Sequence, residues 1–451
     1  MTNYLNLKKV LVTIGFLPML LIAQSTGTTN EFSLQGAIDY AIKHNANYLN
    51  SELDLKLAEY KNREVIGIGL PQVNASADLK DYYQIPTSLL PGQIFGAPAG
   101  TFIPVKFGTQ WNATIGITAS QIIFNSDYLV GLQAAKELKI LSEKNLTRTK
   151  VEMVVNVTKA YYSVLVYNER IKTLQANIDR VKKMYDDIKA MNEAGFVEKI
   201  DKERIELAYN NLLTEKEKAQ RLIGLSETLL KFQMGYPLQD AITLTDILNA
   251  DQFQDITAIA DVKPNYAARS EFTLLESQKR LNELELKRYR LQYVPSLVAY
   301  ASYIKNAQRT EFDFFDPDKK WFPIGIIGAT LNVPIFSGGQ KYYRIQQAKV
   351  SLMKTNNLMN YTKSAFEIET NTAAIIYKNA YVSVQTQIKN KELAKSIYDT
   401  AKKKYEAGVG SSLELISAET SLKEAETNYL NAVYDLIIAK TDLDKAQGNI
   451  K

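Results

Sequence analysis

Two long stretches of the chain place apolar residues at alternating steps of three and four positions. In the first stretch these residues run from Val154 to Ile188. Their mean spacing of about 3.4 residues is typical of a left-handed coiled-coil seam. Neither stretch contains proline, so we predict two continuous helices, at about 127–194 and about 340–407. At ~1.5 Å per residue, each helix is a rod on the order of 100 Å long.

One order of motifs occurs twice along the chain. Gly195 lies 71 residues after Phe124, and Gly408 lies 72 residues after Phe336. Each glycine closes a Glu-Ala-Gly triplet at the end of a predicted rod, where glycine commonly terminates a helix. We therefore predict two structural repeats, 26–235 and 265–451, joined by a connector at 236–264. In each repeat a first helix (about 33–69 or 266–293) precedes a strand pair, the rod and a returning helix (about 200–235 or 411–447).

Ahead of each rod the apolar period changes to two. Val73, Ala75, Ala77 and Leu79 alternate with polar residues, and residues 110–120 alternate in the same way. Stretches of about ten such residues fit membrane strands with one face toward lipid and the other toward water. A soluble β-hairpin packed on a helix fits the same alternation. We predict strand pairs at about 71–123 and about 295–335, with Val298, Ile324 and Ile326 on the water-facing side.

Long loops are predicted where the strands of each pair turn, away from the rods. Residues 85–109 are rich in proline and glycine, and residues 306–320 in phenylalanine and acids. Asp313, Asp316 and Asp318 lack the spacing of a calcium loop, which favours an ordinary acidic loop. Four strands are too few for a transmembrane barrel, since about eight is the smallest number that closes. Strands in lipid would therefore require several copies of the chain.

The first 25 residues have the pattern of a secretory signal peptide. Lys8 and Lys9 precede an apolar run from Val10 to Ala23, which ends in Ala-Gln-Ser. This run is shorter than the roughly 20 apolar residues that a spanning helix needs. We expect residues 1–25 to direct export and then to be cleaved.

Composition excludes several chemistries. The chain has no cysteine, which excludes thiol catalysis. It has one histidine, His44, so a histidine-rich metal site or a catalytic triad would depend on this single residue. No catalytic residue, metal site or cofactor is predicted. The net charge of +5 is small and evenly spread, which argues against nucleic acid as a partner.

Taken together, these features resemble the TolC family of outer-membrane efflux proteins. The residues that carry the resemblance are Val333-Pro334-Ile335-Phe336-Ser337-Gly338-Gly339 before the second rod, then Tyr405-Glu406-Ala407-Gly408, Leu413-Glu414-Leu415-Ile416 and Ala418 at its end. Each motif alone is weak, but their order and spacing match the family over nearly the whole chain after the signal.

The resemblance implies an α+β membrane protein. Three chains would contribute four strands each to a twelve-stranded barrel in the outer membrane of a Gram-negative bacterium. This barrel would continue as an α-helical tunnel through the periplasm. Members of the family are passive exit ducts of tripartite efflux or type I secretion systems. The implied partners are outer-membrane lipid, a periplasmic adaptor and an inner-membrane pump of the RND or ABC type.

The resemblance also implies roles for residues at the ends of the rods. A periplasmic gate or selectivity site would include Asp201, Glu414, Tyr405, Arg204 and Ser417. The family's arginine position is Gly410 here, and one of its acidic positions is Ser417, so the latch would be weakened or rewired. Adaptor-contacting tips would comprise Gly195, Phe196, Val197, Gly408, Val409 and Gly410. Alternatively, Asp201 and Glu414 complement helix dipoles, and the glycines form plain turns.

A second function remains compatible with the sequence. A soluble periplasmic coiled-coil scaffold or adaptor would share the long helices and would pack its β-hairpins internally. Osmotic shock would release such a protein, whereas a duct would need detergent.

Overall fold

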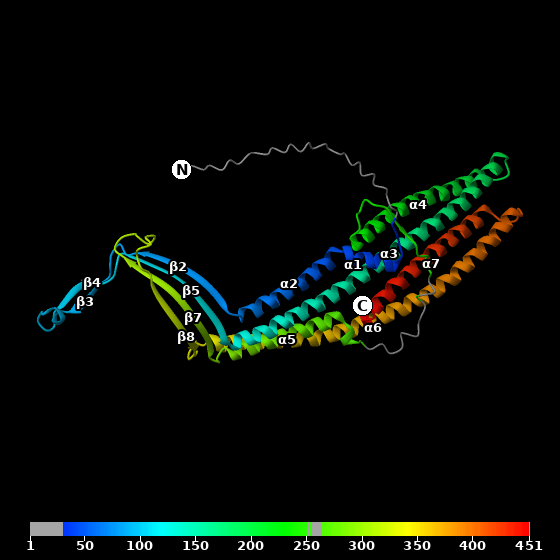
Figure 1. Ribbon diagram of the computed structural model, residues 1–451. Coiled ribbons are helices and arrows are strands. Elements are labelled where there is room, and N and C mark those ends of the chain that lie inside the picture. The colour runs from blue at the N-terminus through cyan, green and yellow to red at the C-terminus, as the bar shows by residue number, and fades with distance from the viewer. Residues whose placement is uncertain (1–29, 250–252, 254–263, 451) are drawn as a thin grey trace, which may run out of the picture.

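The computed structural model describes residues 30–249, 253 and 264–450, which form one elongated molecule (Figure 1). A β-sheet lies at one end, and two helical hairpins lie at the other. The predicted signal peptide lies outside the described residues. Among the helices that the structure describes, none has both the length and the apolarity to cross a bilayer.

Two very long helices form the axis of the molecule. Helix α3 covers Ser126–Glu193 and α6 covers Gln340–Glu406, close to the rods expected at 127–194 and 340–407. The Asn125 side chain begins α3 by accepting a hydrogen bond from the Tyr128 backbone N–H. Most of the α3 seam is buried, including Val157, Tyr161 and Ile188. The period of the seam therefore marks the face that packs against other helices.

Each rod is followed by a shorter returning helix. Helix α4 (Lys199–Met234) packs on α3, and α7 (Ser412–Gln447) packs on α6. Helices α3 and α7 also touch, so the two hairpins lie side by side in the order α4, α3, α7, α6. A buried apolar cluster joins them near their free ends, with Ile178, Ile205 and Leu415 among its members.

The first helix of each repeat differs from the prediction. The segment expected as one helix at 33–69 is split into α1 (Leu34–His44) and α2 (Ala46–Ile68). Asn45 causes the break, because its extended backbone leaves helical geometry while its side chain accepts from Tyr48 N–H and donates to the Gln233 carbonyl. The corresponding second segment is a 3₁₀ turn, Tyr266–Ala268, followed by α5 (Ser270–Leu291).

Four antiparallel strands form the sheet, in the order β2, β5, β7, β8. Their bounds are Gln72–Asp81, Trp111–Phe124, Ser296–Arg309 and Phe322–Asn332. The loop expected at 306–320 is shorter than predicted, because β7 continues to Arg309 and its end pairs with the start of β5.

The register sorts the side chains of the sheet onto two faces. Val73 opposes Ala119, and Ala77 opposes Ile115, so the apolar positions of β2 and β5 share one face. On the other face the Thr118 and Ser302 hydroxyls are hydrogen-bonded at 3.0 Å. Val298 opposes Ile122 there, Ile326 opposes Ser302, and Ile324 opposes Ile304. The three apolar residues predicted on the hydroxyl-bearing face therefore lie on it.

Residues 85–109 are not a simple loop. They contain strands β3 (Thr87–Pro91) and β4 (Phe102–Lys106), which pair as a hairpin at the end of the molecule far from the rods (Figure 1). The expected connector at 236–264 also holds a strand, β6 (Ile242–Leu244), which pairs in parallel with β1 (Asn30–Phe32). Proline within β3 and β4 conceals these two strands in the sequence, although short edge strands tolerate it.

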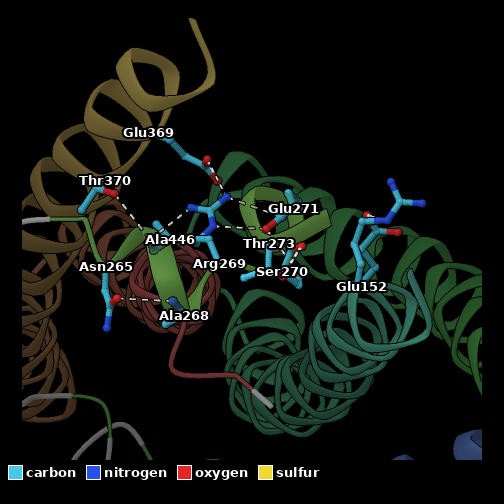
Figure 2. Close-up of polar contacts among 11 residues, drawn as sticks. Glu152, Asn265, Ala268, Arg269, Ser270, Glu271, Thr273, Glu369, Thr370 and Ala446 are labelled. Carbon is cyan, nitrogen blue, oxygen red and sulfur yellow. Dashed lines mark hydrogen bonds and ion pairs between the residues drawn. The ribbon is translucent and has the colours of Figure 1, made fainter. Parts of the chain in front are cut away.

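A buried arginine fixes the start of α5 against the second hairpin (Figure 2). Arg269 is 3% exposed, and its guanidinium lies 4.0 Å from the centre of the Phe366 ring. It bonds Glu369 at 2.9 Å, Glu271 at 3.3 Å and the Ala446 carbonyl at 3.0 Å. One side chain thus joins α5, α6 and the end of α7.

Candidate functional site

The free ends of the two hairpins are tight glycine turns (Figure 1). Gly195 and Gly408 adopt φ values of 80° and 73°, which glycine reaches without strain. Phe196 N–H bonds the Met191 carbonyl at 2.8 Å, and Val409 N–H bonds the Lys404 carbonyl at 3.0 Å. These bonds satisfy the last carbonyls of each rod, so the turns are rigid closures rather than loose loops.

Each turn presents one large apolar side chain to solvent. Phe196 is 83% exposed and Val409 is 80% exposed. Val197 instead packs against the apolar cluster between the hairpins, and its carbonyl accepts from the Asn192 side chain at 2.9 Å. Leu413 and Ile200 beside the turns are also exposed, so the tips present several apolar side chains to solvent.

Asp201 joins the two hairpins just behind the tips. The Ser412 hydroxyl, at the start of α7, donates to the Asp201 carboxylate in the first turn of α4. Arg204 lies on the same side of α4, with its Nη1 3.7 Å from the Asp201 Oδ1. Ser412 was not among the residues predicted from the sequence. The Ser-x-x-Glu pattern of Ser411 and Glu414 marks this helix start, and could have drawn attention to the neighbouring serine.

Glu414 occupies a separate position from Asp201. Its backbone N–H donates to the Ser411 hydroxyl at 3.1 Å, and its carboxylate lies 2.9 Å from Lys404 Nζ. Ser417, one turn further along α7, lines a shallow groove with Glu414 and Thr400 between α6 and α7. Within one chain, each predicted acidic residue is balanced by a cation of its own hairpin.

Tyr405 connects the end of α6 to the end of α3. Its hydroxyl contacts the Met191 sulfur at 3.8 Å. Burial raises the pKa of the Tyr405 phenol, and the negative charges of Asp201 and Asp187 raise it further. The phenol therefore stays neutral and can act as a hydrogen-bond donor toward the neighbouring hairpin.

Gly410 has no room for a side chain. A Cβ atom there would lie 2.9 Å from the Tyr405 nitrogen and 3.0 Å from the Lys404 Cβ. A larger residue at position 410 would therefore require the turn to shift.

The described part of the chain shows no group of three histidine, cysteine, aspartate or glutamate side chains placed to hold a metal. Asp313, one of the acids considered above, is ion-paired with Arg309 at 3.0 Å and Lys319 at 3.3 Å. His44 stacks on Tyr40 with ring centres 3.9 Å apart.

Comparison with known proteins agrees with this architecture. Residues 256–449 match the family model described as "Outer membrane efflux protein". The toluene efflux pump outer membrane protein TtgC of Pseudomonas putida is 20% identical over 345 residues, covering 75% of this chain and 69% of TtgC. The outer membrane protein TolC of Vibrio cholerae is 20% identical over 365 residues, covering 74% of this chain and 76% of TolC.

Solved structures share the fold. The outer membrane protein VceC of Vibrio cholerae superimposes with a TM-score of 0.71 at 16% identity, covering 92% of this chain and 96% of VceC. The CmeC outer membrane channel of Campylobacter jejuni gives a TM-score of 0.72 at 16% identity, covering 92% of this chain and 85% of CmeC. The chain therefore shares its mixed helix and sheet fold with these outer membrane proteins.

Proposed function

We propose, from the premise that this chain belongs to the family of outer membrane efflux proteins, that it is the exit duct of a tripartite efflux or type I secretion system. In this role it conducts substrates passively from an inner-membrane pump across the periplasm and the outer membrane. The observation that carries the proposal is one sheet face that is largely apolar, with Lys305 near its outer end as an exception, and that is joined directly to two rods.

The apolar face runs across all four strands of the sheet. The register brings Ile117, Tyr303 and Gly325 together, and next to them Ala119, Ala301 and Ile327. Ile327 is 90% exposed, and Val73, Ile115 and Leu331 on this face are also exposed. A soluble sheet would cover such a face with a helix, whereas lipid leaves it uncovered.

Both tryptophans of the chain lie at the end of the sheet far from the rods. The Trp111 ring centre is 5.2 Å from that of Phe312, and the Trp321 ring centre is 6.1 Å from that of Phe314. Aromatic rings concentrate where membrane meets water. We place the outer boundary of the membrane at this cluster.

Unpartnered helix faces favour a trimer. Tyr361, Ile368, Ile375 and Val382 repeat every seven residues on α6, and all four are exposed. Helices α4 and α6 are the outer members of the hairpin layer, and α4 exposes Leu207, Leu225 and Phe232. A seven-residue apolar seam needs a partner helix. The α4 of a neighbouring chain supplies one.

The open edges of the sheet also favour a trimer. Strands β2 and β8 are its outer members, and no described strand pairs with their outer edges. Sheet edges cannot remain open in lipid. Three chains with four strands each would close a barrel of twelve, and each chain's two rods and returning helices would surround a periplasmic tunnel below it.

The exposed tips suit contact with a periplasmic adaptor. Phe196 and Val409 would insert between the helices of the adaptor, while the rigid turns around Gly195 and Gly410 fix their positions. Asp201, Glu414, Tyr405, Arg204 and Ser417 would lie at the periplasmic mouth, where three copies form a ring. A pump of the RND or ABC type would complete the system.

Conductance tests the proposed function directly. The purified protein should extract only in detergent, have the mass of a trimer by light scattering, and give discrete conductance steps in a planar lipid bilayer. A water-soluble monomer without conductance would overturn the duct, and would favour the scaffold alternative.

Removing charge at the mouth should change ion selectivity. In the Asp201→Asn/Glu414→Gln variant we expect cation selectivity, measured as a reversal potential in a salt gradient, to fall. The substitutions remove both carboxylates from every chain and leave Arg204 and Lys404 as unbalanced positive charges at a narrow opening. Glu203→Gln is the matched control, since Glu203 is an exposed acid of the same turn, paired with Lys199 at 3.1 Å. An unchanged reversal potential in the double variant would exclude the acidic ring.

A further inference from the structure

A buried carboxylate lies where the two hairpins of one chain meet. Glu419 of α7 has a side chain only 6% exposed. The Nε of Arg180, on α3, lies 3.4 Å from both of its carboxylate oxygens. The Nη2 of the same guanidinium bonds the Asn177 side chain and lies 3.5 Å from Glu426. One cation from the first hairpin thus holds two acids of the second.

The surroundings of Glu419 are mostly apolar. It lines a small cavity between α3, α4 and α7, whose walls include Val181, Ile205, Ala208, Asn211, Leu212, Ile416, Thr420 and Lys423. The charged and titratable groups that face Glu419 are Arg180 from α3, Tyr398 from α6, and Lys423 and Glu426 from α7. The α4 residues that line the cavity are neutral, but Glu215 of α4 pairs with Lys423 at 3.3 Å. Burial raises the pKa of Glu419 to about 7, the Arg180 guanidinium opposes this rise, and the Glu426 carboxylate adds to it.

We propose that Glu419 is a proton-controlled latch between the α3/α4 and α6/α7 hairpins. When its carboxyl group is protonated, it stays in the apolar contact and the hairpins remain packed. When it ionises, the hairpins separate so that water can reach the carboxylate. The consequence for transport, a wider periplasmic mouth, rests on the proposed function.

The sign follows from proton linkage. The packed state holds the Glu419 proton with a pKa of about 7, whereas an exposed glutamate has its ordinary value of 4.5. The packed arrangement binds the proton more tightly, so its extra stability is complete at acidic pH and is lost as pH rises toward 7. Between these two pKa values, the equilibrium constant for separation of the hairpins increases by up to about tenfold per pH unit. Above the higher pKa it no longer increases.

The absence of native cysteine makes this movement measurable. A spin label at Val409→Cys, an 80% exposed position, reports label-to-label distances across the trimer. We expect these distances to increase between about pH 5.5 and about pH 7.5. Glu419→Gln has nearly the same shape and no charge, so its distances should remain short at both pH values. Glu426→Gln should keep the pH response with a lower midpoint, because it removes a negative charge that raises the pKa of Glu419.

Two results would overturn the latch: equal distances in the unmodified background at both pH values, or a full pH response in Glu419→Gln. A chain that is monomeric in detergent would instead overturn the proposed function. The latch can still be tested in that case with labels at both Phe196→Cys and Val409→Cys, since this pair reports the separation of the two hairpins within one chain. A pH-independent distance between them would reject it.

Discussion

The double substitution Ile368→Glu/Ile375→Glu is expected to convert the trimer to monomers and abolish conductance. Both side chains are exposed on the α6 seam in a single chain. In the proposed trimer they are buried against α4 of the neighbouring chain. Placing carboxylates there would bury six unpaired charges per trimer, and each costs several kcal/mol. Light scattering of the detergent-purified Ile368→Glu/Ile375→Glu variant measures the mass, and planar bilayers measure the conductance.

The Ile368→Leu/Ile375→Leu variant provides the control. It alters the same two side chains but keeps them apolar, so the trimer should remain intact. If the Ile368→Glu/Ile375→Glu variant remains a conducting trimer, the α6 seam is not the interface between subunits.

The Arg269→Met substitution should lower the free energy of unfolding by about 3–5 kcal/mol. It leaves Glu271, Glu369 and the Ala446 carbonyl without the guanidinium that they bind. Burial alone would raise the pKa of Glu271, but its backbone hydrogen bond and Arg269 outweigh burial and lower it. The ion pair therefore stabilises the fold above the ordinary pKa of 4.5, and this contribution is lost as pH falls through the depressed value. Urea unfolding in detergent, followed by circular dichroism near neutral and at acidic pH, measures both effects.

Arg221→Met is the matched control for this substitution. Arg221 and Glu217 are both 69% exposed and are 3.9 Å apart, so their pair should contribute only about 0–1 kcal/mol. If Arg269→Met and Arg221→Met unfold at the same urea concentration, the Arg269 cluster does not stabilise the fold.

Much of the architecture could be predicted from local pattern. The seam from Val154 to Ile188 predicts a helix, because a period near 3.5 over many turns is incompatible with strand or loop. The motifs at Phe124 and Gly195 bound this helix, close to the observed ends of α3 at Ser126 and Glu193. A period of two marked β2 and β5 clearly and the second strand pair less cleanly. The break at Asn45 escaped prediction, because its cause is a contact with Gln233, far away in the chain.

The residues near the tips were predicted only in part. The family resemblance pointed to Asp201 and Tyr405, and the structure brings both to the contact between hairpins. Ser412 and Glu419 could not be found in that way. Their importance comes from Asp201 and Arg180, which approach from the other hairpin.

The sequence by itself determined the lengths of the rods, the places where the chain turns and the alternation of its strands. These depend on neighbours within a few residues, and periodicity records them directly. Only the tertiary structure decided which acids lie beside which cations, and which apolar faces remain uncovered. Such pairings join residues hundreds of positions apart, so their burial and charge depend on how the two hairpins pack.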